Sequence, residues 1–451
     1  MIRLRDFRAG LKPMRSFGKV GAAAAALLAA PALSIAWATP ATAQASRAPL
    51  AAPVSADTIA AFYRSRGGAP LWYSPTSGNA AQQLLQLLNT AQADNLNPRR
   101  YNVKALGKAM RAASRRNPKA VQRAEMMLSQ AFVAYARDLK RDPNVGIIYV
   151  DRELRPTPPP ASLLLGQAAM APSLSAFVGQ LGWMNPVYAR LRQALASRNY
   201  RNEHERRLLA INLERARALP SGSHRYAVVN PAAQRMYMYE NGIVVDMMRV
   251  VAGKPDPVAQ TPMMSAYIRF VVLNPYWNAP PDITARRLAP NVVKQGRSYL
   301  KAKGYQVMSD WSDRAKVVNP ASIDWKAVVA GRTQVRLRQL PGPANSMGRM
   351  KFMFPNKQGI WLHDTPSKEV LDEAARLASN GCVRLQDASR FARWLYGRPL
   401  KPQGAKPEQR VPLPAPVPLY ITYLTAVPSG SSIAYFEDMY GLDARARHAS
   451  L

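Results

Sequence analysis

Apolar residues recur at three- and four-residue spacing in the first half of the chain, from about residue 56 to residue 217. This spacing places them on one face of a helix, which can then bury that face against a neighbour. The stretches TIAAFYRSR, AAQQLLQLLNTAQADN, PVYARLRQALASRNY and NEHERRLLAINLERARAL all show it. The apolar face of the longest stretch, AVQRAEMMLSQAFVAYARDLKRD, carries Met127, Leu128, Phe132 and Tyr135. The pattern predicts a helical domain, with the proline-rich segment at 156–162 as a spacer within it.

The apolar period shortens to two residues after a boundary at Pro220-Ser221-Gly222-Ser223. Alternating apolar residues in HRYAVVNPAAQRMYMYENGIVVDMMRVVAGK predict paired strands. Asn241-Gly242 lies between two of these runs and favours a two-residue hairpin turn. The stretches AYIRFVVLNPYW, GIWLH and PLPAPVPLYITYLTAV predict further strands.

A basic segment of mixed pattern interrupts these strands, and it includes the helical stretch APNVVKQGRSYLKAKGY. We therefore expect an α+β protein in which a helical domain precedes a strand-rich domain that carries an insertion. The expected parts are a signal peptide at 1–43, a flexible lead-in at 44–55, a helical domain at 56–220, a strand-rich domain at 221–427 with its insertion at 281–340, and a C-terminal tail at 428–451.

The N-terminus has the pattern of a secretory signal. Six basic residues precede the apolar run VGAAAAALLAAPALSIAWA, and small residues at 41–43 follow it. We expect cleavage after Ala43 and a periplasmic mature protein. A retained membrane anchor is the alternative, but Pro31 and the alanine content would make the run a weak span. No later stretch is long and apolar enough to cross a bilayer, so we expect no stable membrane span after cleavage.

The chain is strongly basic, with a formal net charge of +35. The predicted signal carries six basic residues and Asp6, so the mature chain would keep 35 − 5 = +30. Such a charge favours anionic partners. An exported protein rarely meets nucleic acid, so cell-wall polymers and anionic lipid head groups are the better candidates. The charge is also spread along the chain, which is equally typical of a solvated surface.

Cys382 is the one cysteine of the chain, and His363 is one of four histidines. Exported proteins usually pair their cysteines, and a single cysteine has no partner within the chain. It is therefore either a reactive thiol, an intermolecular link or a buried small apolar residue. His204, His224 and His448 lie outside the stretches that suggest chemistry, and we interpret them as structural or exposed. No metal cluster, phosphate loop or cofactor motif is evident, so we expect no metal and no cofactor.

The residues around Cys382 favour the reactive thiol. GIWLH places His363 at a strand end, and SKEVLDEAARLA predicts a helical turn or short helix that Asn380-Gly381 terminates. A histidine within hydrogen-bond reach would deprotonate the thiol, and Arg384 would favour the thiolate. Free N–H groups of Asn380, Gly381 and Cys382 would then hold an oxyanion.

The stretches LHDTPSK and SNGCVRL resemble the signature of the L,D-transpeptidases, bacterial enzymes that cross-link the cell wall. The resemblance extends to VVAGKPDPVAQTPMMS, VVLNPYWNAPPDI, RLRQLPGPANSMGRMKFMFPN and PVPLYITYLTA in the strand-rich domain. FYRSRGGAPLW and AFVAYARDLKRDP resemble the helical scaffold of the large periplasmic branch. Together these stretches cover most of residues 56 to 450.

Two features depart from that family's pattern. Many members have Ser-His-Gly-Cys before the nucleophile, whereas this chain has Asn380 in place of that histidine. The family's general base is the upstream histidine, so His363 still fills that role. The large branch usually has a small peptidoglycan-binding module between its two domains, but here Tyr200 leads almost directly into the last predicted helix, so we expect the module to be absent.

The resemblance implies a β-sandwich-like catalytic domain with the insertion as a capping subdomain. Cys382 would attack the carbonyl of the diaminopimelate L-centre in a peptidoglycan tetrapeptide stem and release D-alanine, with His363 relaying the proton. The acyl group would pass to an amine of a second stem, forming a 3→3 cross-link. The residues expected to shape the substrate site, or else merely to pack, are Arg384, Trp361, Tyr276 and Asn278.

Two other interpretations are open. With water or another protein's amine as acceptor, the same acyl-enzyme would act as an L,D-carboxypeptidase or tether outer-membrane proteins to the wall. A wall-binding scaffold with a vestigial site is the third interpretation, and the intact His363 and Cys382 argue against it. A positioned thiolate would also open the strained carbonyl of carbapenem-type β-lactams, which we expect to be inhibitors.

Overall fold

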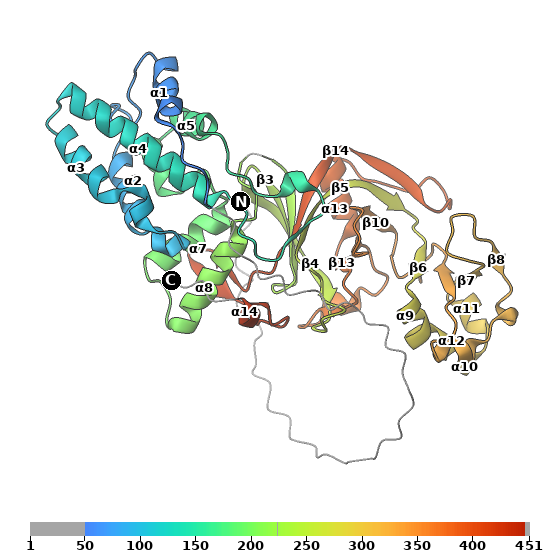
Figure 1. Cartoon of the computed structure of the whole chain (residues 1–451). Helices are drawn as coiled ribbons and strands as arrows, with labels where there is room; N and C mark the ends of the chain where they lie inside the picture. The colour runs from blue at the N-terminus through green and yellow to red at the C-terminus, as the bar shows by residue number, and fades with distance from the viewer. Residues whose placement is uncertain (1–49, 223, 447–451) are drawn as a thin grey trace. The chain divides into compact units, whose positions relative to one another are not determined.

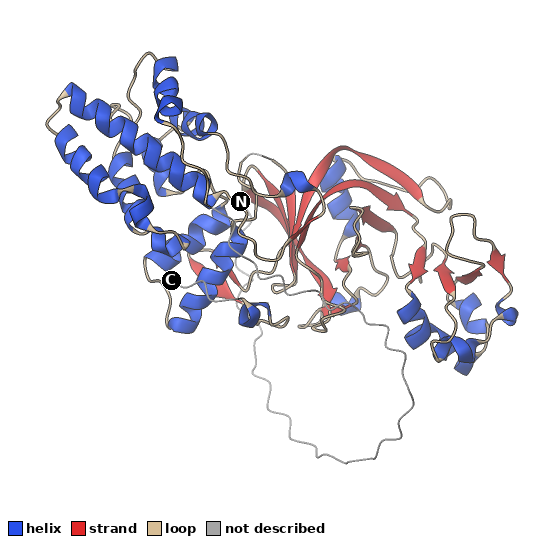
Figure 2. Cartoon of the chain, viewed as in Figure 1, coloured by secondary structure: helices blue, strands red, loops and turns tan. Residues whose placement is uncertain are grey.

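The computed structural model describes residues 50–222 and 224–446. The predicted signal peptide, the first half of the predicted lead-in (44–49) and His448 lie outside the described residues. Helices fill the first half of the described chain and strands dominate the second, so the α+β expectation is confirmed (Figures 1 and 2). Among the described residues, no helix is both long and apolar enough to cross a membrane.

The helical half follows the predicted pattern closely. Asn117 caps the longest helix by accepting hydrogen bonds from Lys119 N and Ala120 N, and Pro118 occupies the first helical position, where no amide hydrogen is needed. The helices are α1 (Ala56–Ser65), α2 (Ala80–Asn89), α3 (Val103–Ala113), α4 (Pro118–Leu139), α5 (Ala161–Met170), α6 (Leu174–Gly179), α7 (Pro186–Ala196) and α8 (Glu203–Ala216), with 3-10 turns η1 (Ala91–Asp94), η2 (Pro98–Tyr101) and η3 (Arg152–Leu154).

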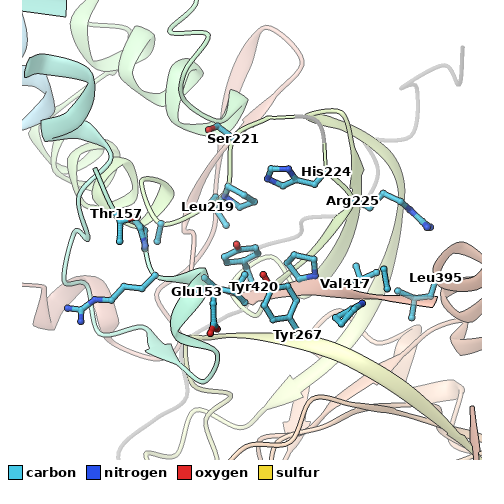
Figure 3. A pocket seen from close by; sticks show the side chains of 18 of the residues that line it. Glu153, Thr157, Leu219, Ser221, His224, Arg225, Tyr267, Leu395, Val417 and Tyr420 are labelled. Carbon is cyan, nitrogen blue, oxygen red and sulfur yellow. The ribbon is translucent and has the colours of Figure 1, made fainter. Parts of the chain in front are cut away.

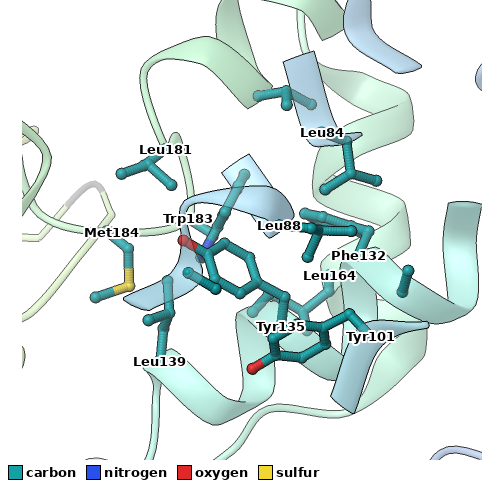
Figure 4. Packing of buried hydrophobic residues seen from close by; sticks show 14 of the residues in the cluster. Leu84, Leu88, Tyr101, Phe132, Tyr135, Leu139, Leu164, Leu181, Trp183 and Met184 are labelled. Carbon is teal, nitrogen blue, oxygen red and sulfur yellow. The ribbon is translucent and has the colours of Figure 1, made fainter. Parts of the chain in front are cut away.

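Aromatic side chains form the centre of the helical core (Figure 4). The rings of Phe132 and Trp183 meet edge to face with centroids 5.0 Å apart, an arrangement that suits their quadrupoles. Tyr135 is fully buried, and its hydroxyl donates to the buried Asp94 at 2.6 Å. Leu128 is also buried, whereas Met127 is half-buried at the edge, so the predicted apolar face is the packed face.

The strand-rich half forms a ten-stranded sheet that closes on itself. The order is β1-β5-β10-β11-β13-β4-β3-β2-β14, with β12 on β4, and β14 pairs with β5 as well as β2. Asn241 and Gly242 both have positive φ and form the predicted hairpin turn between β3 and β4. The strands are β1 (Ile148–Tyr149), β2 (Tyr226–Asn230), β3 (Arg235–Glu240), β4 (Ile243–Gly253), β5 (Met264–Leu273), β10 (Met350–Met353), β11 (Leu362–His363), β12 (Leu377–Ser379), β13 (Val383–Leu385) and β14 (Gln409–Ile421).

Helix α13 (Ala388–Tyr396) covers part of this sheet. Asp387 caps its first turn through Arg390 N, and Gly397 ends it with a φ of +68°, as the sequence pattern predicts. Phe391 on its buried face packs against Phe352 of β10, with ring centroids 4.8 Å apart.

The insertion is a small folding unit with its own apolar core. A four-stranded sheet in the order β6-β9-β7-β8 packs against short helices. Its elements are β6 (Trp277–Ala279), α9 (Pro281–Ile283), the π-turn η4 (Thr284–Leu288), α10 (Ala289–Gln295), α11 (Ser298–Ala302), β7 (Tyr305–Met308), β8 (Val317–Val318), η5 (Pro320–Ser322), α12 (Trp325–Val329) and β9 (Arg336–Gln339).

Of the helical turn or short helix predicted for residues 367–378, the structure has the turn. Only the 3-10 turn η6 (Glu369–Leu371) forms, and the chain then enters β12, which pairs in parallel with the end of β4. The backbone groups of these last residues are satisfied by the sheet, so strand pairing overrides the helical pattern of the sequence.

Residues after 427, which the sequence assigns to a tail, pack on the helical half. Strands β15 (Ala426–Ser429) and β16 (Ser432–Tyr435) form a hairpin, and helix α14 (Leu442–Arg445) follows. Asp443 forms a buried ion pair with Arg215 of α8 and accepts a hydrogen bond from Thr425 at 2.5 Å. This network connects the helical half to the end of the chain.

The buried pair predicts a large stability effect. Asp443→Ala leaves the Arg215 guanidinium buried without its carboxylate, so the free energy of unfolding should fall by about 3–5 kcal/mol. The matched control is Asp372→Ala, which removes a solvent-exposed partner of Arg249 and should cost less than about 1 kcal/mol. Urea unfolding of both variants measures the difference. Equal losses would show that the Arg215–Asp443 pair does not hold the two halves together.

Candidate active site

Two short parallel strands form the centre of the candidate site. In the pairing of β11 with β13, Leu362 lies opposite Val383 and His363 lies opposite Arg384. Leu362 and Val383 are fully buried in the core of the sheet. Because side chains alternate between the two faces of a strand, His363 and Arg384 must share the opposite face.

The same alternation brings the nucleophile candidate to that face. Cys382 is two residues before Arg384, and Trp361 is two residues before His363. Val383 N donates to Trp361 O at 2.8 Å, which holds the two strands in this register. The structure therefore places Trp361, His363, Cys382 and Arg384 on one face of two adjacent strands, although the sequence separates the pairs by about twenty residues.

Lys351 completes this face and was not identified from the sequence. It lies on β10 directly opposite His363, and its Nζ is 4.1 Å from the centroid of the Trp361 ring. Burial lowers the pKa of Lys351, while the charges of Glu408 and Cys382 oppose this shift. The alternation of Lys351 with apolar residues in MKFM indicates that Lys351 points away from the core. Only the strand pairing reveals that it faces His363.

Cys382 is half-buried, and its Sγ lies 3.7 Å from the carbonyl oxygen of Gly359. Burial raises the pKa of the thiol above its ordinary value. A backbone hydrogen bond from Trp361 and the positive charges of Lys351 and Arg384 act in the opposite direction. The resting cysteine is therefore a neutral thiol surrounded by groups that would stabilise the thiolate once it forms.

His363 is buried, and burial lowers its pKa to about 4. The positive charges of Arg384 and Lys351 lower it further, whereas the contact with Asp364 raises it. Its Nδ1 lies 2.5 Å from the carbonyl oxygen of Asp364. A carbonyl only accepts, so Nδ1 carries the proton of the neutral ring and Nε2 remains the basic nitrogen. The ring is thus a neutral base at neutral pH.

The loop after His363 is tied back to the neighbouring strand. Lys368 Nζ donates to Asp364 Oδ1 at 2.7 Å and to the Gln386 carbonyl at 3.0 Å. Asp364 N also donates to Met350 O at 2.9 Å. These contacts fix the carbonyl that orients the His363 ring, so Asp364 and Lys368 are positioning residues that the sequence motif contained without revealing their role.

The bend before Cys382 is held from both sides. Ser379 Oγ donates to Cys382 O at 2.5 Å and accepts from Gly381 N at 3.2 Å. Thr261 Oγ1 donates to Gly381 O at 2.8 Å and accepts from Gly253 N at 2.8 Å. Cys382 therefore lies on a turn that these hydrogen bonds hold in place.

Gly381 is required by this turn. Its φ is +105°, and a Cβ there would lie 2.8 Å from Ile360 Cδ1. Its N–H is engaged by Ser379, although the sequence suggested it as an oxyanion donor. Within the described residues, the N–H groups of Asn380 and Cys382 have no recorded acceptor. Asn380 itself is exposed.

The other two residues expected at the substrate site lie at the base of the insertion. The Arg338 guanidinium stacks over Tyr276 at 4.4 Å from the ring centroid, and Asn278 Oδ1 accepts from Arg336 Nη2 at 3.1 Å. These recorded contacts do not involve Cys382 or His363. Arg287 of the insertion does reach the site electrostatically, because its charge lowers the pKa of Arg384.

The remaining histidines are not part of this arrangement. His204 and His224 are exposed. No group of three or more potential metal ligands occurs among the residues that the structure describes.

Comparison with known proteins identifies both halves of the chain. Residues 224–412 match the L,D-transpeptidase catalytic domain family YkuD, and residues 57–195 match the Scaffold domain family. These matches include no peptidoglycan-binding module, in agreement with the sequence prediction. A Haemophilus influenzae protein named "Putative L,D-transpeptidase" is 29% identical over 250 residues.

The region shared with that relative is 54% of this chain and 49% of the relative, so the match spans about half the length of each. The Scaffold match corresponds to the helical half, and the YkuD match contains the strands that carry His363 and Cys382. Residues 224–412 are therefore identified as an L,D-transpeptidase catalytic domain of the YkuD family, and a Scaffold domain at residues 57–195 precedes it.

Proposed function

We propose that the protein forms 3→3 cross-links between peptidoglycan stem peptides through an acyl-enzyme on Cys382. The observation that carries this proposal is the sheet face that the one cysteine shares with the buried, neutral imidazole of His363 and with two cations, Lys351 and Arg384. A thiol nucleophile with an adjacent base is the arrangement needed for acyl transfer. The substrate would be a tetrapeptide stem, and export to the periplasm would bring the protein to it.

The first half-reaction would start with the Cys382 thiol and the His363 imidazole both uncharged. As Cys382 Sγ attacks the carbonyl of the diaminopimelate L-centre, Nε2 of His363 takes the thiol proton. The tetrahedral intermediate would collapse with cleavage of the bond to D-alanine, whose amine receives the proton from His363. The product is a thioester on Cys382 and free D-alanine, with the histidine again neutral.

In the second half-reaction the acceptor amine would be the nucleophile and Cys382 the leaving group. The side-chain amine of diaminopimelate on another stem attacks the thioester carbonyl, and His363 accepts a proton from that amine. Cys382 leaves as a thiolate and recovers the proton from His363. Lys351 and Arg384 would stabilise the thiolate at both stages, because both oppose the rise of its pKa.

Backbone and insertion residues would contribute to binding. The N–H groups of Cys382 and Asn380 are suited to hold the oxyanion, since neither has another acceptor among the described residues. Arg384 and Trp361 border the nucleophile on the same face and would contact the stem. The insertion, through Arg287, would close over the carboxylates of the substrate and act as the capping subdomain.

The first test of this mechanism is the pH dependence of Cys382 alkylation by iodoacetamide. Since burial raises the thiol pKa and lowers that of His363 to about 4, the resting pair should be uncharged at neutral pH. The alkylation rate should therefore rise steadily through pH 7 with a midpoint above the ordinary thiol range. His363→Ala should leave that midpoint nearly unchanged. A rate plateau beginning near pH 5 in the wild type would instead show a thiolate–imidazolium pair.

The second test measures release of D-alanine from a stem tetrapeptide. Cys382→Ala should abolish release while the thermal unfolding curve stays unchanged, and Cys382→Ser should be nearly as low because a hydroxyl is the poorer nucleophile. His363→Ala should slow acylation by roughly 10²–10⁴-fold, the usual effect of losing a general base. Release by the alanine variant at the wild-type rate would eliminate the cysteine mechanism.

The third test uses a carbapenem. Its strained carbonyl should acylate Cys382 and leave a thioester, which persists if the insertion keeps water away. Intact-mass spectrometry of the exported form should show one adduct of the drug's mass, absent in Cys382→Ala. An adduct on the alanine variant would identify another attacking group. Absence of the adduct while D-alanine release proceeds would contradict the site shape proposed for the insertion.

A further inference from the structure

A cavity of about 890 Å³ lies away from Cys382, where the end of α4, the segment before α5 and strands β5 and β14 meet (Figure 3). Its size is in the range of about 300–1,000 Å³ that holds ligands of drug or short-peptide size. The polar and charged residues that line it include Lys140, Glu153, Arg155, Thr157, Arg217, Ser221, His224 and Arg225.

Positive charge dominates this lining. Lys140, Arg155, Arg217 and Arg225 are cationic, whereas Glu153 is the one carboxylate among the described lining residues. The three arginines already have partners, respectively Asp142, Glu214 and Glu240. Their charges are thus largely neutralised within the protein.

Lys140 differs from these arginines. It caps the end of α4, and its recorded hydrogen bond is to the hydroxyl of Ser221. Within the described part of the chain it forms no ion pair with a carboxylate. Burial lowers its pKa to about 8, and no carboxylate contributes to the shift. Lys140 is half-buried, and an ammonium group partly withdrawn from water is stabilised when an anion approaches it.

The remaining walls suit an elongated organic ligand. Tyr267 and Tyr420 pack together and lie along the cavity (Figure 3), and Pro418 of β14 lies opposite Tyr267 in the strand pairing. A second cavity of about 600 Å³ is also lined by Arg155 and therefore adjoins the first. An acidic peptide could place a carboxylate at Lys140 and extend its aliphatic parts along the tyrosines and prolines.

We propose that this cavity is a second binding site for an acidic stem peptide of peptidoglycan, with one ligand carboxylate held by Lys140 and Ser221. The identity of the ligand rests on the proposed function, because the wall peptide on which Cys382 would act is rich in carboxylates. Such a site would hold the protein on its polymeric substrate while the nucleophile works elsewhere. It would attach the protein to the wall, a role that a separate peptidoglycan-binding module would otherwise fill. The family matches of this chain include no such module.

Isothermal titration with a stem tetrapeptide tests the site in a Cys382→Ala background, in which turnover is excluded. Adding Lys140→Met should weaken a Lys140-dependent binding phase by about tenfold or more, the effect expected for one charge-assisted hydrogen bond. The matched control is Lys119→Met, which removes an exposed lysine of the same helix and should leave binding unchanged. Thermal unfolding of each variant verifies that the helical half remains folded.

Equal affinities in the Lys140 and Lys119 variants, with both folded, would overturn the proposal. A separate titration with inorganic phosphate distinguishes an acidic peptide from any small anion. Displacement of the tetrapeptide by phosphate at comparable concentration would overturn the assignment of the ligand. Release of D-alanine by the wild-type protein, which retains Cys382, is measured in parallel. Absence of release together with Lys140-dependent binding would refute the cysteine mechanism and leave the second site intact.

Discussion

The parallel pairing of β11 with β13 is the constraint on which the candidate site depends. His363 lies opposite Arg384 in this register, and Cys382 and Trp361 precede them by two residues on the same face. If one strand shifted by one residue, its site residues would turn into the core, where Leu362 and Val383 now lie. The apolar core therefore helps to specify the opposite face, because it penalises the one-residue shifts that would move the thiol or the imidazole off that face.

A chain of contacts links this site to the helical half. Arg215 of α8 pairs with Asp443, and Tyr440 in the same segment donates to Gly253 O at 2.7 Å. Gly253 N in turn donates to Thr261, which donates to the carbonyl of Gly381, the residue before Cys382. The C-terminal segment thus braces the turn that presents Cys382 and ties it to the scaffold. This gives a physical reason for the scaffold to be packed on the catalytic domain rather than joined to it by a loose linker.

Much of the fold could be predicted because local patterns were strong. The change of period near residue 220, the Asn241-Gly242 turn and the caps of α13 all form as expected. The local residue pattern suggested His363 and Cys382 as one site and the family resemblance supported it, but neither could give the register of the two strands. Lys351 was missed for that reason: its proximity to His363 exists only across the β10–β11 ladder.

Other errors arose where tertiary contacts replaced local preferences. The stretch at 367–378 has helical spacing, but its end gains more from pairing with β4 than from a short, isolated helix. The N–H of Gly381 looked free in the sequence, yet Ser379 of the same motif accepts its hydrogen bond. The Lys140 cavity could not be found from the sequence either, because its walls come from six separate segments between residues 140 and 420.

The measurement that tests the central claim most directly is analysis of muropeptides after purified sacculi are incubated with the protein. An acyl-enzyme that is passed to a diaminopimelate amine predicts new 3→3 dimers together with loss of tetrapeptide stems, and neither change with Cys382→Ala. Tripeptide stems without dimers would contradict transfer to an amine and would assign the acyl-enzyme to water, as in a carboxypeptidase. An unchanged muropeptide profile under conditions in which Cys382 is intact would contradict the whole account of this sheet face as an acyl-transfer site.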